Sequence, residues 1–348
     1  MRGGAAGLTV SDATGVGHIG TRLCRRVAAG ARAAGAVRAE PRADTRPGGG
    51  RPRRVRIGFH VSVGGGLLKA LREAQLRRCQ TIQVFSAAPS VWKRRTHDDA
   101  EDRAFVEGCA AAAISPIFIH APYLLNLASG DMALWEQSIE VLRHELDAAD
   151  RWRAEGVVVH LGSAGEDPVE AGMERVVQAL NRAREGSCDK ARIILENSAG
   201  QGNSVGHTLE QIGQIIEQAG ADGLGVCIDT AHAFAAGYDL RTVQGLSAML
   251  GQAEEVFGLP MLRLVHLNDS KSTLGSRVDR HEHIGRGQIG REGFRAVLSH
   301  PLLAEMPFIM ETPKRVKHEL EDDLTNLRRV RKLIPIAMRP PLPALPGE

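Results

Sequence analysis

Short apolar runs alternate with longer amphipathic stretches along most of this chain, and this alternation limits the fold more than any other feature. Apolar runs of four to six residues are typical of buried strands, and the stretches between them have helical spacing. Eight such repeats over roughly 260 residues match the count and size of an α/β (β/α)8 TIM barrel, which we predict for a single domain. The runs are Val55–His60, Thr81–Phe85, Ile117–His120, Val157–His160, Ile193–Glu196, Leu224–Asp229, Leu262–His266 and Phe308–Glu311.

A doubly wound open sheet is the main alternative, and it needs a glycine-rich phosphate turn after the first strand. The turn Val63-Gly64-Gly65-Gly66 lacks the required GxGxxG spacing, so the barrel is favoured. The expected helical stretches include Leu67–Leu76, Ala133–Arg153, Glu170–Ala183, Leu209–Ala219, Val243–Val256 and Phe294–Leu298.

Residues outside the repeats divide the chain into three parts. Residues 1–54 are rich in Arg, Ala and Gly without apolar periodicity, and we expect a disordered extension. A start codon placed too early, a basic arm that contacts nucleic acid and a transit peptide all remain open for it. The barrel is expected over residues 55–335, followed by a Pro-rich tail, residues 336–348, that is not expected to fold.

Composition excludes several classes of protein. No apolar run approaches the ~20 residues of a membrane helix, and the five cysteines form no CxxC pair. We therefore expect a cytoplasmic protein, with a monomer as the default. The chain carries +3 overall, but residues 1–54 hold eleven arginines and three acids, so the remainder is net negative. Affinity for nucleic acid must then come from local patches or bound metal.

Six consecutive apolar runs end in a side chain that can bind a metal ion. The carboxyl ends of barrel strands converge on one face, so these residues should meet. A lone strand-end histidine is more often structural, but six ionisable groups buried together cost free energy unless they are paired or metal-bound. His60 ends the first run and is expected to support the ligands. The six candidates are His120, His160, Glu196, Asp229, His266 and Glu311.

Three further candidates lie in loops. His232 follows Asp229 by three residues and should face a neighbouring ion, while Asp279 and His281 project to one side of an extended loop. Nine ligands exceed the ~4–6 that one ion takes, and suit a cluster of two or three. Histidine and carboxylate ligands without cysteine favour zinc, with manganese as the alternative. Three divalent ions would outweigh the four carboxylates, which suits a phosphate substrate.

Five segments of the chain resemble endonuclease IV, the zinc-dependent apurinic/apyrimidinic endonuclease of base excision repair. The resemblance covers roughly residues 55–335, and several of the motifs are ten or more residues long. The segments are FHVSVGGGL at 59–67, HAPYLLNLAS at 120–129, LENSAGQGNSVG at 195–206, VCIDTAHAFAAGYDLR at 226–241 and HLNDSKSTLGSRVDRHEHIGRGQIG at 266–290.

The resemblance implies a (β/α)8 barrel with three zinc ions, manganese being the alternative at one site. It assigns His120, His160 and Glu196 to the first ion, Glu196, Asp229, His266 and Glu311 to the second, and His232, Asp279 and His281 to the third. The implied reaction is hydrolysis of the phosphodiester 5′ to an abasic site in double-stranded DNA by a metal-activated hydroxide. The products are a 3′-hydroxyl and a 5′-deoxyribose phosphate, and Glu196 would orient the nucleophile.

DNA contacts are also implied by the resemblance. Tyr123 and Leu124 lie where the family inserts side chains into the base stack. Candidate phosphate contacts, with a solvated loop as the alternative, are Lys271, Ser272, Arg277 and Arg280. This chain departs from the family at residues 86–92, where SAAPSVW replaces a loop bearing Asn, Gln and Arg. The departure bears on DNA affinity and not on the hydrolytic centre.

Two other functions are alternatives for this sequence. A sugar or sugar-phosphate isomerase or epimerase of the xylose-isomerase-like group shares strand-end Glu, Asp and His ligands but uses one or two metals. The set of His232, Asp279 and His281 argues against it. A catalytically idle DNA-damage binder is disfavoured because all nine candidate ligands are present.

Overall fold

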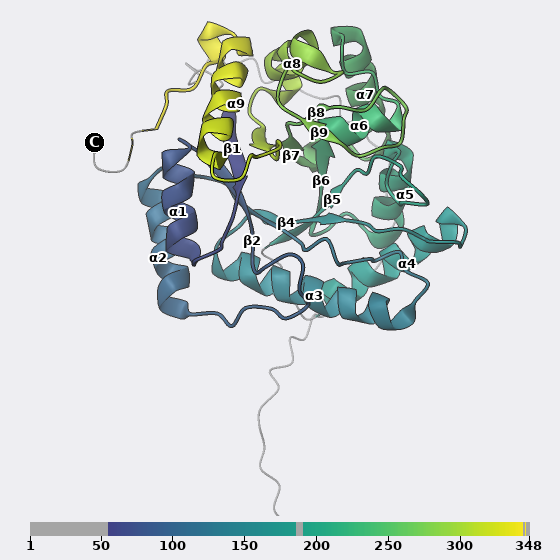
Figure 1. Ribbon diagram of the computed structural model, residues 1–348. Coiled ribbons are helices and arrows are strands. Elements are labelled where there is room, and N and C mark those ends of the chain that lie inside the picture. Colours follow the sequence, from purple (N-terminus) through teal and green to yellow (C-terminus); the bar gives the residue numbers. More distant parts are fainter. Residues whose placement is uncertain (1–54, 186–190, 344, 346–348) are drawn as a thin grey trace, which may run out of the picture. The chain divides into compact units, whose positions relative to one another are not determined.

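The chain closes into a parallel barrel, as a computed structural model that describes residues 55–185, 191–343 and 345 shows (Figure 1). Across these ranges eight strands pair in the order β1-β10-β7-β6-β5-β4-β3-β2. The predicted (β/α)8 fold is confirmed. The strands are β1 (Arg56–Val61), β2 (Thr81–Phe85), β3 (Ile117–His120), β4 (Gly156–His160), β5 (Arg192–Glu196), β6 (Leu224–Asp229), β7 (Leu262–His266) and β10 (Pro307–Met310).

The register of the strands brings their carboxyl ends to one level. His160 of β4 pairs with Glu196 of β5, and Asp229 of β6 pairs with His266 of β7. Two strand ends differ by one residue from the predicted runs, since β1 continues to Val61 and β10 stops before Glu311. Two further short strands, β8 (Asp269–Ser270) and β9 (His281–Glu282), pair with each other in the loop after β7.

Helices surround the barrel (Figure 1), and six pairs of them pack side by side: α1–α2, α3–α4, α4–α5, α5–α7, α7–α8 and α8–α9. Asp98 and Asp131 cap α2 and α3 by accepting hydrogen bonds from the first free N–H groups. None of the helices in the described ranges is long and apolar enough to cross a membrane. The helices are α1 (Leu67–Leu76), α2 (Asp99–Ala111), α3 (Met132–Arg151), α4 (Val169–Arg184), α5 (Leu209–Ala219), α6 (Thr230–Ala236), α7 (Val243–Val256), α8 (Gly290–Ser299) and α9 (Glu319–Leu333).

Two apolar cores follow from the alternation of side chains along each strand. One lies between the barrel and the helices and takes most of the buried apolar residues. The other is a separate cluster of six fully buried strand residues, which alternate with the first set and fill the barrel interior. Its members are Phe118, Val158, Ile194, Cys227, Leu264 and Ile309. This inner core lies inside the barrel directly below the residues at the carboxyl ends of the strands.

The predicted extension, residues 1–54, lies outside the described residues, and the boundaries at 55 and 335 stay predictions. The tail, which we expected not to fold, contacts the outside of the barrel over its described part. The carbonyl of Pro340 accepts a hydrogen bond from Arg331 at 2.7 Å, and that of Pro343 accepts one from Arg78 at 3.2 Å.

Candidate metal centre

Glu196 lies at the centre of the converging strand ends and is fully buried. One of its oxygens, Oε2, is 3.2 Å from His120 Nε2 and 3.5 Å from His160 Nε2. The other, Oε1, is 2.9 Å from His266 Nδ1. The two oxygens of one carboxylate therefore face two separate groups of candidate ligands, as a bridging carboxylate requires.

The second group surrounds His266. Its Nδ1 lies 3.4 Å from Glu311 Oε2 and 3.9 Å from Asp229 Oδ2. One donor atom each of Glu196, Asp229, His266 and Glu311 falls within 4.8 Å of all the others, and the same holds for His120, His160 and Glu196. Both sets of side chains expected from the sequence are thus brought together at the spacing that one ion needs.

The third group forms where the loop after β7 returns to the barrel through the β8–β9 pair. Asp279 Oδ2 is 3.2 Å from His232 Nε2, and Asp279 Oδ1 is 3.4 Å from His281 Nε2. Asp229 also approaches, with Oδ2 3.7 Å from His281 Nε2. Asp229 therefore lies between the second and third groups, which the sequence did not indicate.

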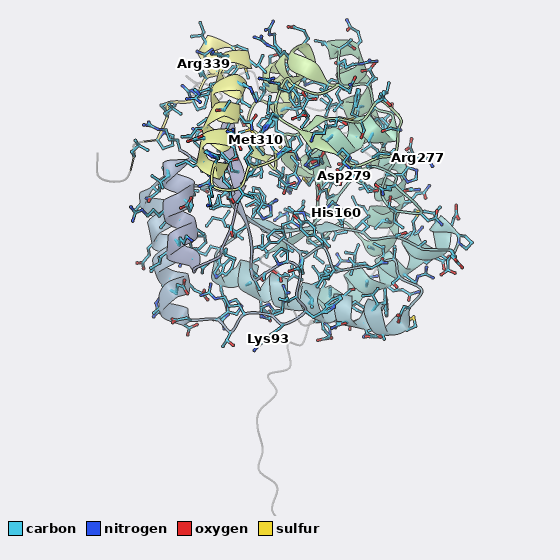
Figure 2. The ribbon with its side chains drawn as sticks, viewed as in Figure 1. Lys93, His160, Arg277, Asp279, Met310 and Arg339 are labelled. Atoms are coloured by element: carbon cyan, nitrogen blue, oxygen red, sulfur yellow. The ribbon has the colours of Figure 1, made fainter. Side chains whose placement is uncertain are left out.

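A cleft of about 550 Å³ opens over these residues, and His120, His160, His232, Asp279 and His281 are among the side chains that line it. His160 and Asp279 lie near the middle of the ring of helices in the view of Figure 2, whereas Lys93 and Arg339 lie at its edge. The candidate ligands that line the cleft are therefore accessible from one face of the barrel.

Two of these imidazoles use one ring nitrogen to hold their orientation. His120 Nδ1 donates to the carbonyl of Ala121 at 2.6 Å, and His232 Nδ1 donates to the carbonyl of Asn197 at 3.0 Å. A carbonyl oxygen can only accept, so Nδ1 carries a proton in both rings and Nε2 is left to share a proton or a cation with the neighbouring carboxylates. Fixing the tautomer through the far nitrogen is typical of metal-binding histidines.

His281 gives the most direct test of whether these residues fit a metal. Its Nε2 is buried and has no hydrogen-bond partner among the described residues, yet it points at Asp229 and Asp279. A buried nitrogen without a partner costs about 1–3 kcal/mol, and coordination to a cation removes that cost. The donor set fits a divalent metal.

Two residues missed by the sequence analysis hold the ligands in place. Gln83, buried in β2, donates from Nε2 to Glu311 Oε1 at 2.7 Å and accepts from His266 Nε2 at 2.9 Å. Asn268 donates to Asp229 Oδ2 at 2.6 Å and accepts from the backbone N–H of Glu311 at 2.8 Å. The sequence feature that could have indicated Gln83 is a glutamine inside the mostly apolar run Thr81–Phe85. His60 supports the ligands as expected, with Nδ1 2.9 Å from Glu311 Oε1.

The electrostatics of the centre favour bound positive charge. Burial alone would raise the pKa of Glu196, but His160 and His266 hold it well below the usual value. Burial likewise works against protonation of His232, yet Asp229, Asp279 and Glu196 raise its pKa well above 6.5. The pKa of Asp279 falls to about 2, because His232 and His281 outweigh its burial. Protons and metal ions therefore compete for the same imidazoles.

Of the residues expected to contact DNA, Tyr123 lines the cleft. Tyr123 is 65% exposed, and its ring centroid lies 5.3 Å from that of Phe85 and 5.9 Å from that of His120. Leu124 beside it is half-buried. Tyr123 is thus a large aromatic side chain held at the entrance to the centre.

The cations of the loop after β7 are exposed. The backbone N–H of Lys271 donates to the carbonyl of Arg280, which ties the two sides of the loop together, while Ser272 is half-buried. Arg277 has a φ of 55° and lies further from the middle of the ring than Asp279 in the view of Figure 2. Within the described residues none of these three cations forms an ion pair, so their role in phosphate binding stays a prediction.

The altered loop after β2 is anchored to the barrel by a buried carboxylate. Glu145 of α3 accepts hydrogen bonds from Ser86 at 2.8 Å and from Arg94 at 3.2 Å. Arg95 is paired with Glu101. The arginines that follow residues 86–92 are therefore held by protein carboxylates.

Comparison with known proteins matches residues 69–333 to the family described as xylose isomerase-like TIM barrel. A probable endonuclease 4 from Methanoculleus marisnigri is 43% identical over 281 residues, which are 80% of this chain and 99% of that protein. Endonuclease IV from Thermus thermophilus superposes with a TM-score of 0.71 at 36% identity, over 80% of this chain and 98% of its own. A D-tagatose 3-epimerase-like protein shares the fold at 19% identity, with a TM-score of 0.61 over 79% of this chain and 96% of its own.

Proposed function

Because this chain belongs to the endonuclease IV family of the xylose isomerase-like TIM barrels, we propose that it is an abasic-site endonuclease of DNA repair. It hydrolyses the phosphodiester 5′ to an apurinic/apyrimidinic site in double-stranded DNA and leaves a 3′-hydroxyl and a 5′-deoxyribose phosphate. The observation that carries the proposal is the third group, His232, Asp279 and His281, beside the two groups that share Glu196.

The three groups would hold zinc, with manganese as the alternative at one of them. His120, His160 and Glu196 form the first set. Glu196, Asp229, His266 and Glu311 form the second, and His232, Asp279 and His281 form the third. When bound, such ions lower the pKa of water and neutralise charge that develops on a phosphodiester.

Glu196 is proposed as the catalytic residue among the protein side chains. Its low pKa keeps it ionised, so it accepts a hydrogen bond from the attacking water and orients it toward the phosphorus. Gln83 and Asn268 hold Glu311, His266 and Asp229 at fixed positions around it. The chain needs no serine or cysteine nucleophile, and we expect no covalent intermediate.

Recognition of DNA is assigned to the rim. Tyr123 and Leu124 would enter the base stack beside the abasic site, which favours extrusion of the lesion into the cleft. Phosphate contacts are proposed for Lys271, Ser272, Arg277 and Arg280. A monomeric state and a cytoplasmic location stay predictions.

The test uses a duplex with a single tetrahydrofuran abasic analogue, which cannot undergo β-elimination. We expect a nick that leaves a 3′-hydroxyl and that disappears after EDTA treatment. Metal-loaded protein that leaves this duplex intact but epimerises a ketose would instead establish the sugar epimerase alternative. A protein that binds the duplex without cutting it would establish the idle damage binder.

A further inference from the structure

A basic cavity lies on the outside of the barrel, between the start of α8 and the second half of α9. Its volume is about 240 Å³, and its polar lining comes from Arg286, Arg291, Arg329 and Lys332, with no acidic residue. We propose that this α8–α9 cavity binds a phosphate group. The proposal concerns residues outside the metal centre and its rim.

The four cations have no ion-pair partner within residues 55–185 and 191–343. There Arg329 donates only to the neutral amide oxygen of Asn326, at 3.1 Å. Burial and the proximity of Arg286 lower the pKa of Arg329, although Glu282 and Asp322 act in the opposite direction. Asp322 is itself held by Arg315 at 2.7 Å. An anion in the cavity would relieve this repulsion.

Helix electrostatics explain only part of the cluster. Arg329 and Lys332 near the end of α9 interact favourably with the negative end of the helix dipole. Arg291, however, is the second residue of α8, where the dipole favours an acid, and Arg286 belongs to a loop. The side chain of Arg291 lies against Gly285, where an added Cβ would come within 2.7 Å of Arg291 Cγ. Three separate elements thus direct cations to one point.

A hydrogen-bonded amide connects the cavity to the catalytic cleft. Asn326 Oδ1 accepts from the backbone N–H of Ile284 at 3.2 Å, and Asn326 Nδ2 donates to Thr312 Oγ1 at 2.9 Å. Thr312 follows Glu311 and lines the cleft. Arg329 lies three residues, or about 4.5 Å of helix rise, from Asn326. The cavity is therefore close to the face on which DNA would lie.

The ligand chemistry is a phosphate group, because guanidinium groups match phosphate oxygens in pairs. One source rests on the proposed function and is a backbone phosphate of the duplex that flanks the abasic site. The other source is free phosphate. Duplex DNA carries one charge per ≈1.7 Å of axis, so a duplex that extends past the cleft presents many phosphates to this side of the barrel. We expect the DNA source.

The experiment compares wild-type protein with R291A/K332A, which removes two exposed cations and no buried group. R103A, which removes an exposed arginine on α2, is the matched control. Each protein cleaves tetrahydrofuran duplexes of about one and about three helical turns, roughly 10 base pairs per turn. Protein melting is followed in parallel with and without inorganic phosphate.

For the double variant we expect KM on the long duplex to rise about three- to tenfold at unchanged kcat. The slope of its salt dependence should fall by about two, one for each lost contact. The short duplex and R103A should behave as wild type. If DNA cleavage is unaffected but phosphate raises the melting temperature of wild type more than that of the variant, the cavity is a site for free phosphate.

An unchanged KM together with identical phosphate effects on both proteins would overturn the proposal. Failure of the proposed function has a different signature, because wild-type protein would then cut neither duplex. Melting of wild type and variant with and without inorganic phosphate would still decide whether the cavity binds anions.

Discussion

Two layers of side chains point into the barrel, two residues apart along the chain, and they have opposite chemistry. The lower layer is the inner core, Phe118, Val158, Ile194, Cys227, Leu264 and Ile309. Two residues further along the chain lie the ligand candidates, five of them at strand ends and Glu311 directly after β10. They are His120, His160, Glu196, Asp229, His266 and Glu311. Because side chains alternate along a strand, both layers point into the barrel. The step between them is only about 6.6 Å.

The comparison separates what holds the fold from what performs the chemistry. The lower layer is apolar and complete without a ligand, so it stabilises the barrel by packing. The upper layer collects ionisable groups that are stable together only when paired or bound to a cation. His60 and Gln83, from β1 and β2, complete the upper layer through hydrogen bonds to Glu311. A substitution in the lower layer should therefore leave the chemistry of the upper layer intact. A substitution in the upper layer should leave the packing of the lower layer intact.

The largest expected effect is on activity, from Glu196→Gln in the upper layer. Removing the shared negative charge should lower kcat on the abasic duplex by at least about 10³-fold, because the water loses its orienting acceptor and two metal sets lose an anionic ligand. Steady-state cleavage measures this. Ile194→Val, two residues earlier on the same strand, should keep wild-type kcat. Comparable losses of kcat in both variants would contradict the assignment of catalysis to the upper layer and of packing to the lower layer.

A large effect on stability is expected from Ile194→Ala in the lower layer. The cavity should lower the free energy of unfolding by about 2–5 kcal/mol, against about 0.5–1.5 for Ile194→Val. Urea denaturation measures the difference. The metal content of the folded variant should equal that of wild type. Loss of metal without loss of stability would show that the lower layer does more than support the strand ends.

A smaller effect on activity is expected one step further out, at the rim. Tyr123→Ala should raise KM for abasic duplex by about five- to a hundredfold, the range expected for loss of one stacked aromatic side chain. Thermal stability and metal content should not change, since the ring is largely exposed. A variant with unaltered KM would remove Tyr123 from the DNA-binding surface.

The smallest expected effect is a pH dependence that arises in the metal centre and not in the lower layer. In metal-free protein the pKa of His232 is raised above 6.5, so its contribution to stability is full below pH 6.5 and is lost as pH rises through the folded value. The pKa of Glu196 is lowered, so its contribution is present above pH 4.5 and is lost as pH falls. Burial raises the pKa of Cys227 to about 12, so the lower layer adds nothing across this range.

In chelator-treated protein His232 and Glu196 should therefore contribute most to stability between about pH 4.5 and 6.5, which the difference between the melting curves of wild type and His232→Gln measures. Adding zinc should stabilise the protein increasingly above that range, because metal binds the neutral imidazole. A difference between metal-free wild type and His232→Gln that grows from pH 6.5 to 8 would contradict the raised pKa of His232.

The sequence was sufficient for the upper layer because barrel geometry places every strand end on one face. His120 and Glu311 are almost two hundred residues apart, yet alternation and strand count alone predict that they meet. Gln83 was not predicted, since its hydrogen bonds to His266 and Glu311 depend on strand register across the barrel. The α8–α9 cavity was also missed, because its cations converge only after three separate elements pack together.

The central claim is that the three groups of candidate ligands hold three divalent ions, and counting the ions tests it most directly. Native mass spectrometry of wild-type protein purified without chelator should show three ions per chain. The variant D279A should retain two, because only the third group loses a ligand. A wild-type chain that saturates at one or two ions, with D279A unchanged, would contradict the account and favour the epimerase type of centre.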